Sequence, residues 1–279
     1  MTQKDNKLKV MLETNVMQTA YYDETDGGLT SEVNGTATNL WRKLRQRAFL
    51  AISGKARGQV YEIHKSWMGD LKGKKVLELG VGHGCKLTSY LAAQSGEYHA
   101  LDLSQHEIDL LKKRLPKTKP VHVHVVDFLS DDFMDEEFDL IYAHSVLHHF
   151  KHFDVALERV HQKLAPGGQV ISYDPLQVWI PIRLLRLAYR PFQTDAAWEF
   201  PFSRATCNQI EDTFEVQDRF GVFNKAKWAL LLGMLNPRWG QAFGDRWFRQ
   251  DLSDRKRSAT MMKSLHISFL MQKRDLPRA

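Results

Sequence analysis

The residues best suited to chemistry are three glycines at alternate positions, Gly80, Gly82 and Gly84, which follow an apolar run containing one acid, Glu78. An apolar strand that breaks into glycines turns abruptly into a helix and leaves bare main chain on which a ligand can lie. A carboxylate at the loop mouth repels phosphate but attracts an ammonium or a sulfonium. The pattern therefore predicts a site for a cationic ligand, and we expect Gly82→Leu to fill it and abolish binding.

A second acid, Asp102, ends the apolar stretch 97–101, which predicts the second strand of the chain. A carboxylate at this place can accept a hydrogen bond from each hydroxyl of a ribose, as in nucleoside-binding folds of Rossmann type. The alternative is that Asp102 caps the helix that follows, but Ser104 offers a better cap there. The sequence therefore favours a nucleoside as the ligand.

Histidines gather after a further predicted strand, 138–143, at His144, His148, His149 and His152. A spacing of i and i+4 on a helix can hold a metal, but no third ligand type follows at a recognisable spacing, so we predict no metal site. A neutral imidazole can take a proton from a hydroxyl or an ammonium near physiological pH. We therefore expect His148 or His149 to act as a general base; a packing or capping role is the alternative.

These stretches resemble the motifs of the class I (Rossmann-like) S-adenosylmethionine-dependent methyltransferases of the small-molecule type. The pattern E-x-G-x-G-x-G at 78–84 resembles their first motif, residues 144–150 resemble the motif after the fourth strand, and Leu-x-Pro-Gly-Gly at 164–168 precedes another apolar strand. The resemblance runs from 76 to 175. It implies S-adenosylmethionine (SAM) as cofactor, S-adenosylhomocysteine (SAH) as product, and methyl transfer to an O, N or C atom of a small, partly hydrophobic metabolite.

The resemblance also implies roles for individual residues. The cofactor contacts that it implies are Glu78, Gly80, Gly82 and Gly84 for the methionine end, Asp102 with Leu103 for the ribose, Asp127 with Phe128 for the adenine, and the backbone of His144. For the acceptor we expect contacts from a lid residue, Tyr22, and from Asp174, Trp198 and Glu199.

Strand and helix patterns alternate along the chain, which predicts an α/β fold with a mostly parallel sheet. The resemblance implies a doubly wound sheet of seven strands in the order 3-2-1-4-5-7-6, with the last strand antiparallel. We expect one structural domain made of an N-terminal helical lid (1–70), a SAM-binding core (71–175), cap insertions around the sixth strand (176–263), and the last strand with its tail (264–279). Residues 39–65 have the spacing of one amphipathic helix.

Bulk composition limits the partners. The chain has 279 residues and a net charge of +6, and its Lys and Arg residues form no long basic tract, so we expect no nucleic-acid partner. Two cysteines give no disulfide framework, and we expect a cytoplasmic protein with no signal segment and no membrane span. The segments 176–192 and 225–247 are apolar with flanking Lys and Arg, so peripheral membrane contact is a further hypothesis, beside plain packing on the sheet.

Two other classes of function share some of these residues. A nicotinamide-dependent oxidoreductase would share Gly82 and Asp102, but Cys85 in place of a third glycine and Glu78 before the turn both count against it. A binding module that keeps the fold without turnover is the other alternative. Within the methyltransferase interpretation, a lipid-linked or membrane-associated acceptor is the alternative to a small metabolite.

Overall fold

The computed structural model describes residues 3–24, 36–115, 121–133, 137–193, 196–255 and 258–274. Across these residues one sheet has seven strands in the order β3-β2-β1-β4-β5-β7-β6. The first five strands run parallel, and β7 runs antiparallel to both β5 and β6. The predicted fold class and strand order are confirmed. The strands are β1 (Lys75–Leu79), β2 (Glu97–Asp102), β3 (His122–Val125), β4 (Phe138–His144), β5 (Leu164–Pro175), β6 (Phe214–Val222) and β7 (His266–Lys273).

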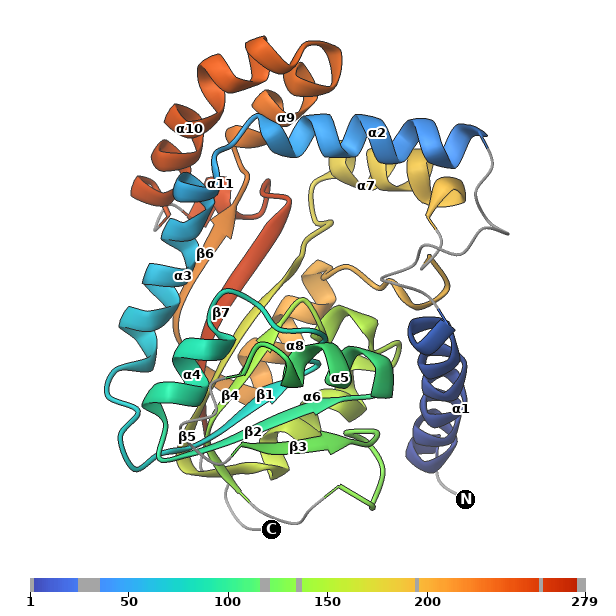
Figure 1. Cartoon of the computed structure of the whole chain (residues 1–279), viewed down its shortest axis with the longest axis vertical. Helices are drawn as coiled ribbons and strands as arrows, with labels where there is room; N and C mark the ends of the chain where they lie inside the picture. Colours follow the sequence, from blue (N-terminus) through green and yellow to red (C-terminus); the bar gives the residue numbers. More distant parts are fainter. Residues whose placement is uncertain are drawn as a thin grey trace.

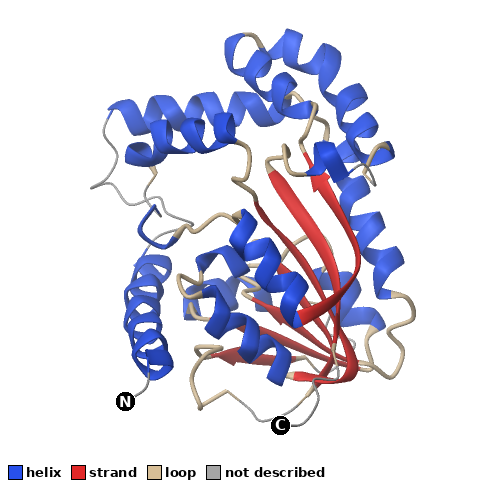
Figure 2. Ribbon diagram, turned by 180° about the vertical axis from the view of Figure 1, so that it is seen from behind, coloured by secondary structure: helices blue, strands red, loops and turns tan. Residues whose placement is uncertain are grey.

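Helices cover both faces of this sheet (Figure 1, Figure 2). On one face Leu77 of β1 belongs to the same hydrophobic cluster as residues of α6 and Ile210 of α8. On the other face Val76 belongs to a cluster with Leu91 of α4 and Ile108 of α5. Neighbouring residues of β1 thus serve opposite layers, because successive side chains of a strand point to opposite faces. These helices are α4 (Thr88–Gln94), α5 (Gln105–Lys112), α6 (Phe153–Gln162) and α8 (Arg204–Thr213).

Before the first strand the chain forms three helices, α1 (Gln3–Glu24), α2 (Thr36–Leu50) and α3 (Gly54–Met68). The prediction of one helix over 39–65 is wrong, because the chain breaks between α2 and α3. Ser53 adopts an extended backbone there and its side chain accepts a hydrogen bond from the backbone N–H of Ala56, which caps α3. Residues 25–35, part of the predicted N-terminal lid (1–70), lie outside the described residues.

A group of four helices lies beyond the carboxyl ends of β1 and β4 (Figure 1). It consists of α2, α7 (Ile180–Tyr189), α9 (Ala226–Leu235) and α10 (Pro237–Ser253), and we call it the cap. A Cβ added to Gly244 would lie 1.7 Å from the carbonyl oxygen of Ala51, so only glycine lets α10 approach the end of α2 this closely. The cap therefore joins segments far apart in sequence, including α2 from the predicted 1–70 lid.

The remaining short elements are α11 (Ser258–Met261) and the 3₁₀ turns η2 (Leu147–His149), η3 (Arg190–Phe192) and η4 (Ala196–Trp198). The turn η2 follows β4 and carries two of the predicted histidines. Among the described helices, none combines the length and the apolar character needed to cross a bilayer.

Candidate active site

The glycine loop after β1 has the backbone that its sequence predicts. Gly80, Gly82 and Gly84 all have positive φ, at 60°, 50° and 94°. A Cβ at Gly80 would lie 2.2 Å from Cγ2 of Val146, so this glycine is required both by its dihedral angle and by the close approach of the chain after β4. The backbone N–H of Gly82 donates to Oδ2 of Asp102 at 2.7 Å, which fixes the loop against the end of β2.

Glu78 is buried beneath this loop, and the predicted position at the open mouth is corrected. Its carboxylate accepts hydrogen bonds from the Thr88 hydroxyl at 2.8 Å and the Tyr98 hydroxyl at 2.7 Å, and the Cys85 thiol lies 3.5 Å away. Burial raises the pKa of Glu78 although these three donors act to lower it. The side chain therefore ties β1 to β2 and to the start of α4. Helix α4 begins at Thr88, whose side-chain oxygen accepts a hydrogen bond from the backbone N–H of Cys85.

Two adjoining cavities flank the glycine loop and together contain all nine predicted cofactor residues. The first, the loop cavity, has a volume of about 280 Å³ and is lined by Asp102, Leu103, Asp127 and Phe128 as well as Gly80 and Gly82. The second, of about 530 Å³, is lined by Glu78, Gly84 and His144 and shares Gly80 and Gly82. The sheet brings these residues together because the carboxyl ends of parallel strands meet at one edge.

Helix α1 covers the loop cavity, a role that the sequence predicted only at Tyr22. Asn15 and Gln18 are buried polar residues that line the cavity beside Tyr22. The Asn15 amide donates to Oδ2 of Asp127 at 2.8 Å. The spacing of positions 15, 18 and 22 on one helix face was the signal in the sequence for this polar stripe.

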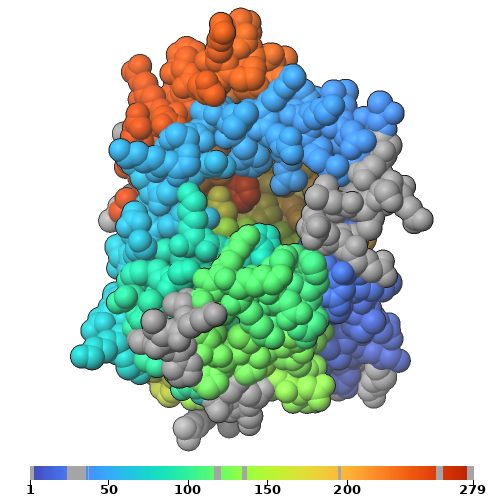
Figure 3. Space-filling model, in the orientation of Figure 1, coloured from blue at the N-terminus to red at the C-terminus, as the bar shows by residue number. Residues whose placement is uncertain are grey.

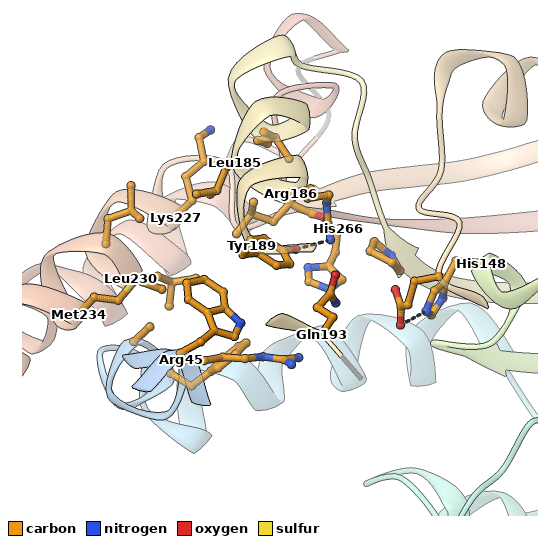
Figure 4. Close-up of a pocket in the computed structure, with 18 of the residues that line it drawn as sticks. Arg45, His148, Leu185, Arg186, Tyr189, Gln193, Lys227, Leu230, Met234 and His266 are labelled. Atoms are coloured by element: carbon orange, nitrogen blue, oxygen red, sulfur yellow. Dashed lines mark hydrogen bonds and ion pairs between the residues drawn. The ribbon is translucent and has the colours of Figure 1, made fainter. Parts of the chain in front are cut away.

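A third cavity, of about 560 Å³, lies between the loop cavity and the cap, and we call it the cap cavity. Figure 3 shows a hollow between α2 and the body that carries the sheet. The apolar part of its wall includes Trp179, Leu185, Leu230 and Met234, from α7, α9 and the chain before α7. The residues labelled in Figure 4 come from α2, α7, α9, the turn after β4, the chain after η3 and the start of β7. The cap cavity and the loop cavity share Tyr22, Ser145 and His149.

Ser145 stands at this junction in a conformation that non-glycine residues rarely adopt. Its φ is 59°, and its backbone N–H donates to the carbonyl of Tyr173 at 2.8 Å. Backbone strain of this kind is held in place by its surroundings and is concentrated at functional sites. No pattern in the sequence predicts this conformation, because serine is not a residue that favours positive φ.

His148 is held between two acids. Its Nδ1 lies 2.9 Å from Oδ1 of Asp174 and its Nε2 lies 3.3 Å from Oε1 of Glu199. Burial alone would lower the pKa of His148, but the hydrogen bonds and charges of the two acids outweigh burial and raise the pKa to about 9. Burial acts to raise the pKa of Glu199, but His148 holds it down at about 2. His148 is therefore an imidazolium at neutral pH, and both its nitrogens are engaged.

His149 has the opposite character. Burial, followed by the charge of His148, lowers the pKa of His149 to about 4, so its ring is neutral at physiological pH. Its Nδ1 lies 3.0 Å from the carbonyl oxygen of Trp198. A neutral ring that donates from Nδ1 leaves Nε2 as a proton acceptor. Of the two predicted bases, the geometry favours His149.

The predicted acceptor residues divide into two pairs. Tyr22 and Glu199 line the cap cavity. Asp174 is fully buried behind His148, and the Trp198 ring is buried against Tyr21, with ring centroids 5.0 Å apart. Asp174 and Trp198 therefore position His148 and His149, and neither lines the cavity.

Comparison with known proteins bears on this arrangement. Residues 77–170 match a family model described as a methyltransferase domain. This part of the chain, from β1 into β5, is therefore similar to a methyltransferase domain. The part of this domain after the glycine loop carries Asp102, Asp127 and the paired histidines of η2.

Two curated relatives match the chain over part of its length. The probable phthiotriol/phenolphthiotriol dimycocerosates methyltransferase 2 of Mycobacterium ulcerans is 33% identical over 148 residues, which are 50% of this chain and 49% of that protein. The fatty-acid O-methyltransferase of Mycolicibacterium smegmatis is 33% identical over 112 residues, 38% of each chain. The chain thus spans about half or less of the length of these relatives.

A solved structure similar to the whole fold is the magnesium protoporphyrin IX methyltransferase of Synechocystis PCC 6803 with bound SAH. The TM-score is 0.54 at 11% sequence identity, over 93% of this chain and 99% of that chain. At this identity the similarity shows the fold alone. Because it covers 93% of this chain, the likeness in fold extends well beyond residues 77–170.

One side-chain group, two of whose members lie within residues 77–170, has the spacing of a metal site. Ligand atoms of His148, His149 and Glu199 lie within 4.8 Å of one another. Protonated His148 already balances the charge of Glu199, so a cation bound there would first have to displace a proton. The donors fit an acid-and-histidine network better than they fit a metal.

The His148 network predicts a pH dependence of stability. Because the pKa of His148 is raised from 6.5 to about 9 on folding, its contribution is fully present below pH 6.5 and is lost as the pH rises through 9. We expect the free energy of unfolding of the wild-type protein, relative to His148→Gln, to fall by about 3 kcal/mol between pH 6 and pH 9.5. Urea unfolding of both proteins across this range measures it, and a difference that is constant with pH would contradict it.

Proposed function

We propose that this protein is a SAM-dependent methyltransferase that acts on a small, partly hydrophobic acceptor. One observation carries the proposal: the loop cavity and the cap cavity meet at Tyr22, Ser145 and His149. A junction of this kind holds two reactants in contact, and proximity supplies much of the catalysis when charge is neutralised as the new bond forms. The match of residues 77–170 to a methyltransferase domain supports the same activity.

The side chains that line the loop cavity are of the kinds that would bind the ribose and the adenine of the cofactor. The carboxylates of Asp102 and Asp127 can accept hydrogen bonds from ribose hydroxyls and from an exocyclic amine, and Phe128 offers an apolar surface for a base. Asn15 of α1 donates a hydrogen bond to Asp127, so α1 would cover the bound nucleoside. When bound, SAM supplies a methyl group on a sulfonium centre for in-line attack.

In this proposal His149 is the general base. Nε2 of His149 takes the proton that the acceptor loses, if its attacking atom starts protonated. His148, held as an imidazolium by Asp174 and Glu199, keeps His149 neutral by its charge. Trp198 orients the ring through its carbonyl oxygen.

The acceptor side favours a lipid-like molecule. The wall of the cap cavity is mostly apolar and its volume of about 560 Å³ is in the range of small-molecule sites. The relatives named above are named for dimycocerosates and for a fatty acid, which supports an acceptor with a hydrocarbon part. A lipid-linked or membrane-associated acceptor is the second candidate, and the atom methylated is O, N or C in either case.

If the acceptor is membrane-associated, we expect the segments 176–192 or 225–247 to contact the membrane surface. Several large apolar side chains of these cap segments are exposed, namely Ile180, Leu184, Leu187, Trp228 and Leu235. Arg183 and Arg190 stand among them, which suits an anionic bilayer. If the protein does not sediment with phosphatidylglycerol vesicles more than with phosphatidylcholine vesicles, this part of the proposal is wrong.

The predicted division of the chain into a lid (1–70), a core (71–175), insertions around the sixth strand (176–263) and the last strand with its tail (264–279) remains part of the proposal. A cytoplasmic location is also proposed. Cys85 and Cys207 are both free thiols, which suits a reducing compartment. Cell fractionation tests the location.

The function is tested by isothermal titration of the full chain with SAM, SAH and NADH. We expect micromolar binding of SAM and SAH and no heat with NADH. Binding of NADH alone would support the nicotinamide oxidoreductase instead, and no binding of any of the three would support a binding module that keeps only the fold.

A further inference from the structure

The cap cavity carries an excess of positive charge. Arg45, Arg186 and Lys227 line it, together with one carboxylate, Glu199. Glu199 and Asp174 both pair with the imidazolium of His148, and the charge of Arg186 also acts on Glu199. Arg45 is exposed to solvent, whereas Arg186 is half-buried, and a half-buried cation is costly unless an opposite charge reaches it. The imbalance therefore points to an anion in the ligand.

Arg186 of α7 is the lining cation that keeps an N–H group without an acceptor among the described residues. Its Nη1 donates to the Tyr189 hydroxyl at 2.9 Å and its Nη2 to the carbonyl oxygen of Leu265 at 3.2 Å. Its Nε is buried and finds no partner in the part of the chain that the structure describes. By contrast, the Lys227 ammonium is 2.8 Å from the carbonyl of Lys263 and also bonds to Asn224, so it is committed to the protein.

His266 adds a second polar atom without a partner to the same wall. Its Nδ1 is buried and makes no hydrogen bond within the described residues. Its ring is stacked on Tyr173, with centroids 5.2 Å apart and planes 8° apart, so it is held rigidly. Figure 4 shows His266 beside Arg186. Burial, followed by the charge of Arg186, keeps the pKa of His266 well below its ordinary value, so the ring is neutral and still carries one N–H.

We propose that Arg186 and His266 bind an anionic oxygen group of the acceptor, a carboxylate or a phosphate, while its hydrocarbon part lies along the apolar wall of α7 and α9. A guanidinium N–H and an imidazole N–H are the donors that such a group prefers. Leu185, Leu230 and Met234 supply the apolar wall. The inference rests on the proposed function, since it takes the cap cavity as the acceptor site, and it narrows the acceptor to an anionic amphiphile.

The test titrates decanoate, decyl phosphate and decan-1-ol into the SAH-loaded full chain. The three probes share one chain length, so differences report the head group. We expect at least one of the two anions to bind about 10-fold or more tightly than decan-1-ol. The tighter anion tells a carboxylate acceptor from a phosphate acceptor.

Variants assign the effect to the named residues. We expect Arg186→Met to remove the preference for the anion while leaving the affinities for decan-1-ol and SAH unchanged. Arg204→Met changes an exposed arginine of α8 that lies outside the cap and does not line the cap cavity, and this matched control should keep the preference. His266→Phe keeps a ring against Tyr173 and should lower anion affinity by about 3-fold to 5-fold. If Arg186→Met does not fold, Arg186→Lys should fold and keep the preference within about 5-fold.

The outcomes separate the two proposals. If the wild-type protein binds SAH but prefers neither anion to decan-1-ol, or if Arg186→Met keeps the preference, the inference is overturned and the proposed function stands. If the wild-type protein does not bind SAH, the proposed function itself fails.

Discussion

Gly80→Ala is expected to weaken SAH binding by about 100-fold. The new Cβ would lie 2.2 Å from Cγ2 of Val146, and alanine at a φ of 60° adds backbone strain. Overpacking and strain together amount to about 3 kcal/mol, which corresponds to that loss of affinity. The loop can relieve the clash only by moving away from the chain after β4, and this movement displaces the backbone on which the nucleoside would lie. Isothermal titration with SAH measures the loss.

Gly73→Ala is the matched control. Gly73 has a φ of 77°, but a Cβ there would meet no atom within 4 Å. It therefore imposes a similar backbone strain without the clash, and SAH affinity should stay at the wild-type level. The double variant Gly80→Ala/Val146→Ala should recover part of the affinity. Normal affinity in Gly80→Ala alone would mean that the glycine loop is not the cofactor site.

His149→Ala is expected to slow methyl transfer by about 10² to 10⁴, the usual contribution of a positioned general base. The reason is that Nε2 of His149 is a proton acceptor at the junction of the two cavities. The expectation holds for acceptors whose attacking atom starts protonated. The measurement is the initial rate of SAH formation at saturating SAM, with hydroxyl acceptors obtained from a screen of hydroxylated amphiphiles.

The pH profile gives an independent test of the same role. Because the pKa of His149 is lowered to about 4, the ring is neutral between pH 6 and pH 8, and the wild-type rate should not rise through this range on account of His149. His152→Ala, which changes a nearby histidine that lines neither cavity, should leave the rate unchanged. An unchanged rate and an unchanged profile in His149→Ala would refute the base.

Strands and the acids at their ends were predictable because their signals are local. The stretch 97–101 was predicted as a strand and β2 spans Glu97–Asp102. The stretch 138–143 was predicted and β4 spans Phe138–His144. An apolar run of strand length bounded by glycine or by an acid needs no knowledge of its partner in the sheet. The order of the strands came from the family resemblance, since pairing is not a local property.

Helix boundaries and buried polar groups were less predictable. At the break between α2 and α3, Ser53 donates hydrogen bonds to Asp245 of α10, almost 200 residues later in the chain. Glu78 was expected at an open loop mouth, but Tyr98 from the neighbouring strand and Thr88 from the next helix enclose it. Each of these outcomes depends on a contact between distant segments.

By itself, the sequence determined the glycine loop, the acids that face it, and the two histidines after the fourth strand, because residue type and spacing along one strand or turn suffice for those. Only the tertiary structure decided which histidine is charged, since Asp174 and Glu199 reach His148 from β5 and from the chain before α8. It also brings Arg186 of α7 and His266 of β7 to the wall of one cavity, the proposed acceptor site. Charge state and cavity chemistry depend on neighbours in space, and those neighbours are set by packing rather than by position in the chain.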